Sequence, residues 1–318
     1  MLGKLTLVIM AAALLPMLFE LADRSKTYYV SETEGIVVIS GATSGLGLDS
    51  AFDFASKNFL VLAGARSQAK ADKLQAKATE KGFSKDVFRA IVLDVTNEEH
   101  WQDAVKSTKQ AMKETNREFN GLINNAGVHH RMLMEKELDP VTMDIWRKVY
   151  DVNIFAVVGL TKAFEELIVS SKARIVNVGS VAGEVSIPMS ETYSSTKFAL
   201  RAISDAWRGF YSLHGVSVSL VAPGYVRSQM CDPTKEKNCQ ARGPEDTTTP
   251  AYFDAIRSPN PKSKYIVSDV MFIDTPFGKL AIPGSFMVPF LNHFVPTRIQ
   301  DAIAMNELQK RMKNDDWN

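Results

Sequence analysis

A tyrosine and a lysine four positions apart, Tyr193 and Lys197, are the residues of this chain most directly suited to chemistry. In a helix such a pair lies on one face, one turn apart. A phenol ordinarily has a pKa near ~10, and a neighbouring ammonium favours the phenolate and lowers that pKa. The pair therefore predicts a tyrosine that acts as general acid and base at physiological pH. The spacing alone is common in helices, so its meaning depends on the rest of the chain.

A glycine-rich turn, GATSGLG, follows the first strongly apolar run of the chain, Ile36 to Ile39. Glycines permit a tight turn and a close approach of the backbone, and the N–H groups at the start of the next helix bind a pyrophosphate. The spacing is G-x-x-x-G-x-G, and its position directly after a first strand favours a dinucleotide site. The residues predicted to form it are Gly41, Ser44, Gly45, Leu46 and Gly47.

Arg66 follows the second predicted strand, where dinucleotide-binding sheets discriminate between the two nicotinamide cofactors. An acidic residue there hydrogen-bonds a ribose 2′-hydroxyl, whereas an arginine accommodates a 2′-phosphate. The sequence has the arginine and no acid, which favours NADP(H) and leaves NAD(H) as the alternative. A solvated arginine at a helix start would have the same sequence. Asp94, which could meet the adenine, and its neighbour Val95 are further candidate cofactor contacts after the third predicted strand.

These residues need elements that bring them together, and the chain alternates short apolar runs with longer amphipathic segments. Such alternation predicts an α/β fold with a parallel sheet covered on both faces, and right-handed connections make it a doubly wound Rossmann fold. We expect a single domain over 31–318 that ends in a substrate or lid region at about 225–300, with 225–284 read as a long loop. The expected strands are 36–39, 59–63, 90–93, 121–123, 174–178 and 216–221, and the expected helices are roughly 45–57, 67–81, 97–115, 142–170 and 191–213.

In this combination and order the residues resemble the short-chain dehydrogenase/reductase superfamily. The glycine turn, Asn124–Gly127, Asn153, Ser180 and the Tyr193/Lys197 pair are followed by Pro223-Gly224, and the match covers about residues 36–228. Ser180 precedes Tyr193 by thirteen residues, a typical separation. Two positions depart mildly from the family, because Ser40 and Ser228 stand where threonine is usual. Both departures keep the hydroxyl.

The resemblance implies a role for each matching residue. Tyr193 would exchange a proton with the substrate oxygen, Lys197 would lower the pKa of Tyr193 and bind the nicotinamide ribose, and Ser180 would orient the substrate oxygen. Asn153 would hold, through its backbone, a water that continues the proton path from Lys197. The further residues implied to bind cofactor are Asn125, Ala126, Gly127, Pro223, Gly224 and Val226, together with Tyr193 and Lys197.

The predicted substrate is a hydrophobic alcohol or its carbonyl, because the region from Lys262 to Asp301 is similar to the ends of retinol and hydroxysteroid dehydrogenases. An apolar patch between Phe286 and Val295 is either core or a lid that contacts membrane. His129, His130, Met132 and Leu133 either line the substrate side or lie at the surface. The alternatives to an NADP(H)-dependent oxidoreductase of this kind are a cofactor-binding scaffold without turnover and a soluble dehydrogenase for a small polar substrate.

The ends of the chain and its polar composition bear on location and partners. Leu5 to Phe19 is a run of fifteen apolar residues, so residues 1–30 are expected to be a signal anchor or interfacial helix, a cleaved signal, or a buried helix. The anchor predicts membrane association at the endoplasmic reticulum, and cleavage a secretory or organellar location. The net charge of +1 gives no reason to expect a nucleic-acid partner.

Two further expectations concern cysteines and assembly. Cys231 and Cys239 are either free thiols or a local disulfide, and no metal-ligand spacing is present, so no metal is expected. Helix 191–213 carries an apolar stripe that is expected to pack mainly in the core. The resemblance adds a homodimer, since family members often pair this helix with its twin. The stripe consists of Phe198, Ile203, Ala206, Trp207 and Phe210.

Overall fold

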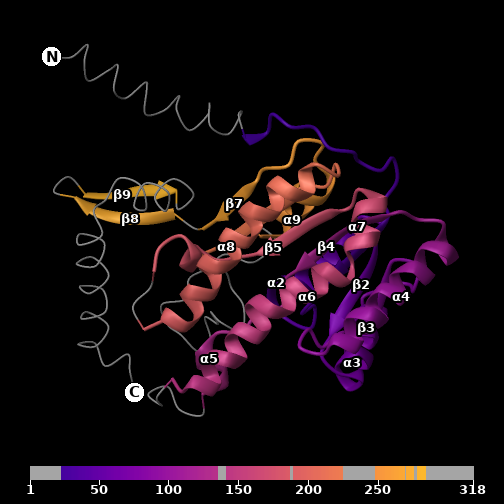
Figure 1. The fold of residues 1–318 in the computed structure, drawn as a ribbon, viewed down its shortest axis with the longest axis horizontal. Coiled ribbons are helices and arrows are strands. Elements are labelled where there is room, and N and C mark those ends of the chain that lie inside the picture. Colours follow the sequence, from indigo (N-terminus) through magenta and orange to yellow (C-terminus); the bar gives the residue numbers. More distant parts are fainter. Residues whose placement is uncertain are drawn as a thin grey trace.

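Parallel strands form the centre of the molecule, in the order β3-β2-β1-β4-β5-β6-β7 (Figure 1). This computed structural model describes residues 23–134, 141–186, 189–224, 248–268, 270–275 and 278–283. Neighbouring strands of the sheet are parallel throughout. The predicted doubly wound sheet is therefore confirmed. The strands are β1 (Ile36–Ile39), β2 (Leu60–Ala65), β3 (Phe88–Val92), β4 (Phe119–Asn124), β5 (Arg174–Val178), β6 (Val218–Pro223) and β7 (Lys264–Val267), with β8 (Val270–Thr275) and β9 (Gly278–Pro283) as a separate antiparallel pair.

Helices cover both faces of the sheet, which explains why the central strands are continuous apolar runs. In β1, Val37 and Ile39 pack into the core on one face, and Ile36 and Val38 pack into the core on the other. All four side chains are fully buried. The first face is covered by α2 (Gly45–Ser56), α3 (Gln68–Glu80) and α9 (Thr248–Arg257), and the second by α4 (Glu98–Thr115), α6 (Ala156–Ala163), α7 (Glu165–Ser171) and α8 (Glu191–Ser212).

The single helix expected over 142–170 is in fact four consecutive segments. They are α5 (Met143–Tyr150), the π-helical turn η2 (Asp151–Phe155), α6 and α7. A π turn inserts one residue into the helical repeat and often occurs at functional sites. Here it contains Asn153, so the interruption falls on a residue that the sequence had singled out.

The reading of 225–284 as a long loop is wrong for its second half. Residues 248–257 form α9 and residues 264–267 form β7, the edge strand beside β6. The region is rich in proline, aspartate, threonine and lysine, but Tyr252, Ala255 and Ile256 are fully or almost fully buried in α9. Residues 225–247, with Val226, Ser228 and both cysteines, and residues 284–318, with the apolar patch, lie outside the described residues.

The apolar stripe of α8 is core in part: Ile203 and Trp207 are half-buried and pack against the core. The buried residues of α8 include Lys197, Leu200, Ser204 and Tyr211. By contrast Phe198 is 38% exposed and Phe210 is 51% exposed. The expectation that the stripe packs in the core is therefore wrong for these two rings.

Residues 23–34 run across the amino-terminal edge of the sheet before β1 begins (Figure 1). We call this segment the strap. Backbone contacts fasten it: the Tyr28 amide donates to the Pro259 carbonyl at 2.8 Å, and Arg257 donates to the Ser31 carbonyl at 2.7 Å. The apolar run at 5–19 lies outside the described residues, and none of the helices in the described part of the chain is long and apolar enough to cross a membrane.

Candidate active site

Two loops meet at the carboxyl edge of the sheet, one after β1 and one after β4. These strands are neighbours, although the chain continues from β1 to β2 on the other side, so their ends form the switch point where such sheets bind ligands. Gly41 has φ +66°, and a Cβ on it would lie 2.8 Å from the Cα of Ala126. A Cβ on Gly47 would lie 2.5 Å from the Gly41 carbonyl oxygen. Glycine is therefore required at both positions for the loops to touch.

Ser40 and Asn125 hold these two loops together. The Ser40 hydroxyl oxygen accepts from the amides of Asn125 and Ala126, both at 3.0 Å. The Asn125 side chain donates to the carbonyls of Ser40 at 3.0 Å and Gly41 at 3.1 Å. Its oxygen accepts from the hydroxyl of buried Tyr252 at 3.2 Å. Serine thus supplies the hydroxyl that threonine supplies in the family. The part played by Tyr252 was missed, because it lies in the segment read as a loop.

The start of α2 has the features of an anion site. Ser44 is its N-cap in extended conformation, but the serine side chain makes no capping hydrogen bond, and the first turn contains no acidic residue. The N–H groups of that turn and the helix dipole therefore favour a negatively charged group. Together with the close approach allowed by Gly41 and Gly47, these features fit the pyrophosphate of a dinucleotide.

The three other cofactor contacts predicted at the ends of β2 and β3 differ in whether their side chains are free to bind a ligand. Arg66 is exposed at the end of β2 and makes no hydrogen bond or ion pair with another described residue. The Asp94 carboxylate accepts from the amide and hydroxyl of Thr96, at 3.0 and 2.8 Å. The Val95 side chain is buried, and its carbonyl accepts from the indole of Trp101 at 2.8 Å. Their contacts with cofactor stay predictions.

Tyr193, Lys197 and Ser180 converge where β5 ends and α8 begins. The Lys197 Nζ lies 5.5 Å from the centre of the Tyr193 ring and donates to the Val178 carbonyl at 2.8 Å. Ser180 follows β5, and its hydroxyl accepts from the Ala182 amide at 3.1 Å. A hydrogen bond links Ser180 to the phenol of Tyr193. The structure therefore brings together the three side chains that the sequence placed in one centre.

Burial dominates the electrostatics of this centre. Lys197 is only 5% exposed, and burial lowers its pKa to about 8. Burial also raises the pKa of Tyr193, and the hydrogen bond with Ser180 offsets only part of that rise. On balance the pKa of Tyr193 is raised, so the expected net lowering is wrong: burial of the phenol is the larger effect, and the Lys197 ammonium is directed at the Val178 carbonyl. That this ammonium favours the phenolate when the proton leaves stays a prediction.

Asn153 is a clamp between three elements. Its side chain is buried, accepts from the Val128 amide at 2.9 Å, and donates to the Val128 carbonyl at 2.9 Å and to Thr196 at 3.1 Å. It therefore joins η2, the loop after β4 and α8. The side chain thus links the loop after β4 to α8, a contact that the sequence analysis did not predict. A water on its carbonyl stays a prediction.

The loop that carries Ser180 is held by a buried carboxylate that the sequence analysis missed. Glu184 is 1% exposed and accepts from Arg201 at 2.9 Å and from Lys264 at 2.9 Å. These contacts tie the loop to α8 and β7. Ser180 also donates to the Pro223 carbonyl at 3.4 Å, and a Cβ on Gly224 would lie 2.5 Å from the Ser268 hydroxyl. The predicted Pro223-Gly224 segment therefore borders the centre, whereas Val226 is outside the described residues.

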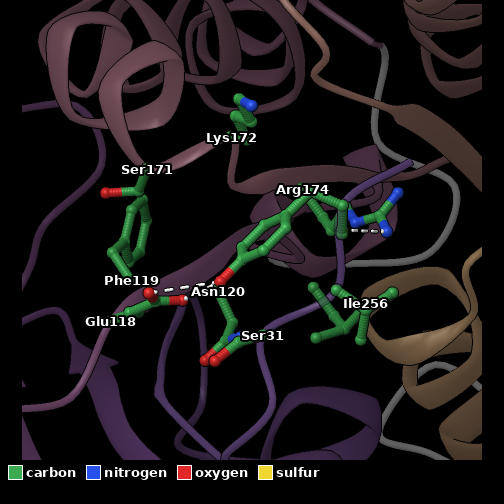
Figure 2. Close-up of a pocket in the computed structure, with 10 residues that line it drawn as sticks. Ser31, Glu118, Phe119, Asn120, Ser171, Lys172, Arg174 and Ile256 are labelled. Atoms are coloured by element: carbon green, nitrogen blue, oxygen red, sulfur yellow. Dashed lines mark hydrogen bonds between the residues drawn. The ribbon is translucent and has the colours of Figure 1, made fainter.

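A small cavity lies at the opposite, amino-terminal edge of the sheet (Figure 2). Its walls include Tyr29 and Ser31 of the strap and Arg174 at the start of β5. Since Arg174 begins the strand and Ser180 follows its end, the cavity is separated from Tyr193 by the length of β5. None of the predicted catalytic or cofactor residues lines it.

Comparison with known proteins places these features in a family. The family described as short chain dehydrogenase matches residues 35–238, more than half of the chain. Mitochondrial D-beta-hydroxybutyrate dehydrogenase of Mus musculus is 35% identical over 59% of this chain and 53% of its own length. Retinol dehydrogenase 5 of Mus musculus is 31% identical over 74% of this chain and 71% of its own. The chain thus spans about half the length of the first relative.

A solved structure supports the fold. A short chain dehydrogenase from Burkholderia cenocepacia in complex with NADP superposes with a TM-score of 0.59 and 21% identity, covering 74% of this chain and 88% of that one. At this identity the likeness is evidence for the fold alone.

Proposed function

Because this chain belongs to the short-chain dehydrogenase family, we propose that it is an NADP(H)-dependent oxidoreductase that interconverts a hydrophobic alcohol and its carbonyl compound. The observation that carries this proposal is the convergence of Tyr193, Ser180 and Lys197 beside a glycine turn that fits a dinucleotide. Each side chain has a part that its surroundings support.

The protein's share of the reaction is to hold the substrate oxygen and to move one proton. The dinucleotide, when bound, supplies the hydride chemistry. In reduction Tyr193 donates its phenolic proton to the carbonyl oxygen, and in oxidation it takes that proton back. Ser180 hydrogen-bonds the same oxygen and orients it. The Lys197 ammonium, with a pKa of about 8, stands within one helical turn of the phenol and favours the phenolate that forms when the proton leaves.

The cofactor preference rests on Arg66. Its exposed guanidinium stands directly after β2 with no partner among the described residues, as a 2′-phosphate site requires. Titration of the purified protein with NADPH and with NADH tests this preference. We expect tighter binding of NADPH, and Arg66→Asp should reverse the order. Equal affinities in the unmodified protein would contradict the preference.

The substrate class rests on apolar side chains at the mouth of the site. Met132 is 48% exposed, Leu133 is 37% exposed and Met189 is 44% exposed. The contact of His129 with Ser190 brings their two segments together. Exposed apolar groups around a catalytic centre favour a lipid-like substrate, such as those in the names of retinol dehydrogenase 5 and of 17-beta-hydroxysteroid dehydrogenase type 6 from Bos taurus. The name of D-beta-hydroxybutyrate dehydrogenase supports a second candidate, a small hydroxy acid.

A substrate screen separates these candidates. The full chain is assayed with NADPH and retinoid, steroid and other lipophilic ketones, and with NADP⁺ or NAD⁺ and D-beta-hydroxybutyrate. We expect turnover with lipophilic compounds and its loss in Tyr193→Phe, which should still bind NADPH. Turnover only with the hydroxy acid supports the second candidate. Cofactor binding without any turnover indicates a scaffold, and near-normal turnover of Tyr193→Phe contradicts the role of the tyrosine.

We also propose that the chain is attached to a membrane of the endoplasmic reticulum through its apolar run at 5–19 and forms a homodimer. Carbonate extraction of membranes and the mass of the mature N-terminus test the attachment. The exposed rings of Phe198 and Phe210 on α8 support a contact between copies. Sedimentation of the unmodified chain and of Phe198→Ser/Phe210→Ser tests it, and a monomer in the unmodified chain rules it out.

A further inference from the structure

His129 packs directly against the proposed proton donor. Its ring centre lies 4.9 Å from that of Tyr193, with 42° between the ring planes. Its Nε2 lies 3.3 Å from the hydroxyl of Ser190, the residue just before α8 begins. His129 therefore contacts both the catalytic ring and the start of the helix that carries it. The sequence left open whether this histidine lines the substrate side or lies at the surface.

The hydrogen bonds of His129 define its protonation. Its Nδ1 accepts from the Arg131 amide at 3.3 Å, so in the neutral imidazole the proton is on Nε2, which donates to Ser190. Burial first, and then the nearby charges of His130 and Arg131, lower the pKa of His129 to about 3. His129 is therefore uncharged at physiological pH.

The other charged or titratable groups around this ring do not oppose that state. His130 stacks on His129 at 4.1 Å, and burial lowers its pKa as well. The Glu191 carboxylate raises the pKa of His130, but this effect is smaller than the lowering by burial. Lys197, whose Nζ lies 5.5 Å from the centre of the Tyr193 ring, donates to the Val178 carbonyl. A second cation on the Tyr193 ring would favour the phenolate, so a neutral imidazole leaves this effect to Lys197.

His129 belongs to a loop that already contacts the rest of the site. Asn125 of this loop holds the glycine turn through Gly41, and Val128 is clamped by Asn153. The contacts of His129 with Tyr193 and Ser190 add the catalytic helix. One short segment thus connects the dinucleotide loop to the phenol.

We propose that His129 is a positioning residue for the reaction: its stacking on Tyr193 and its hydrogen bond to Ser190 fix the orientation of the phenol and keep water from one face of the ring. This inference rests on the proposed function, since it assigns a role around the same tyrosine. It predicts an effect on turnover and proton affinity of Tyr193, and none on cofactor binding.

The kinetic test uses His129→Ala, which removes both contacts, and His129→Phe, which keeps only the stacking. We expect kcat of His129→Ala to fall on the order of 10-fold with unchanged KM for NADPH, and His129→Phe to recover most of that loss. The control is His214→Ala, because exposed His214 packs edge-on against Phe210 at 5.4 Å just beyond the carboxyl end of the same helix. A kcat of His129→Ala equal to that of the control contradicts the proposal.

A spectroscopic test does not depend on turnover. The ¹³Cζ resonance of Tyr193 is assigned with Tyr193→Phe and titrated with pH. Because burial is the main cause of the raised pKa of Tyr193, its midpoint in His129→Ala should fall by at least about half a pH unit, and should not move in His214→Ala. An unmoved midpoint overturns the inference about His129 alone. Loss of the proposed function would instead appear as absent turnover in the unmodified protein.

Discussion

The two edges of the sheet each contain a buried cation, and the two cations are used differently. Lys197 lies at the carboxyl edge and is 5% exposed, and Arg174 lies at the amino edge and is 2% exposed. Neither forms an ion pair with a carboxylate of the described residues. Burial lowers the pKa of Lys197 to about 8 and that of Arg174 to about 10. Burial of each charge therefore costs free energy. The hydrogen bonds of the two side chains show which groups offset that cost.

Arg174 uses its donors within the protein. It donates to the Ser217 hydroxyl at 2.9 Å, to the Tyr29 carbonyl at 2.6 Å and to the Ser258 carbonyl at 3.1 Å. Its guanidinium also lies 5.2 Å from the centre of the Tyr28 ring. It thereby fastens the strap to β5 and to the segment after α9. A cation with this many acceptors holds structure together.

Lys197 leaves donors unused within the described part of the chain. Its hydrogen bond in the structure goes to the Val178 carbonyl, and an ammonium has more N–H donors than this one acceptor requires. The remaining donors point to a ligand-binding role, beside Tyr193. The comparison teaches that the number of acceptors around a buried cation, rather than its burial, separates a structural from a functional charge.

Replacement of Lys197 by methionine should give the largest effect. We expect turnover of Lys197→Met to fall on the order of 1,000-fold, because the charge that favours the phenolate is lost. The free energy of unfolding should stay the same or rise, since a poorly solvated charge is replaced by an apolar side chain of similar length. Kinetics and urea unfolding of the same preparation measure both. A variant that loses stability together with activity would make Lys197 structural and break the comparison.

Replacement of Arg174 by methionine should give the opposite pattern. We expect Arg174→Met to lower the free energy of unfolding by about 3 kcal/mol, because the carbonyls of Tyr29 and Ser258 lose a charged donor in a buried place. Turnover per folded molecule should not change. The control is Arg117→Met, since Arg117 donates to the Asn58 carbonyl at 2.6 Å near the surface. Equal losses in the two variants would contradict a special role of Arg174.

The sequence predicted those parts of the molecule whose signal is local. The glycine turn and the Tyr193/Lys197 pair need only neighbours in the chain, and both are where they were expected. The contact between Tyr252 and Asn125 joins residues 127 positions apart, and that between Arg174 and Tyr29 joins residues 145 positions apart. Pairing over such distances leaves no periodicity in a single sequence.

The error about the pKa of Tyr193 has a related origin. Helical spacing correctly predicts that Lys197 is near Tyr193, but the pKa of the phenol depends on how completely the surrounding elements remove water. That includes His129, which comes from the loop after β4 rather than from α8. The sequence analysis also missed α9 and β7. Both elements are short, and the polar residues around them obscure their apolar periodicity.

The smallest predicted effect is a difference between Lys197 and Arg174 in how each makes the free energy of unfolding depend on pH. Below pH 8 Lys197 is charged in both folded and unfolded chains, so its burial cost is constant. Between pH 8 and about 10 the folded chain releases the proton while the unfolded chain, with an ordinary lysine pKa near ~10.4, keeps it. The unfolded chain then binds more protons, so the free energy of unfolding rises with pH.

Lys197→Met lacks this rise. We therefore expect the stability of the unmodified protein minus that of Lys197→Met to increase by about 2 kcal/mol between pH 8 and pH 10. Subtraction removes the titration of all groups that the two chains share. The same difference for Arg174→Met should rise much less in this range, because Arg174, with a pKa of about 10, stays mostly charged until pH 10. Urea unfolding at half-unit pH steps measures both differences, and a flat result for Lys197 would mean that its ammonium is better solvated than its burial implies.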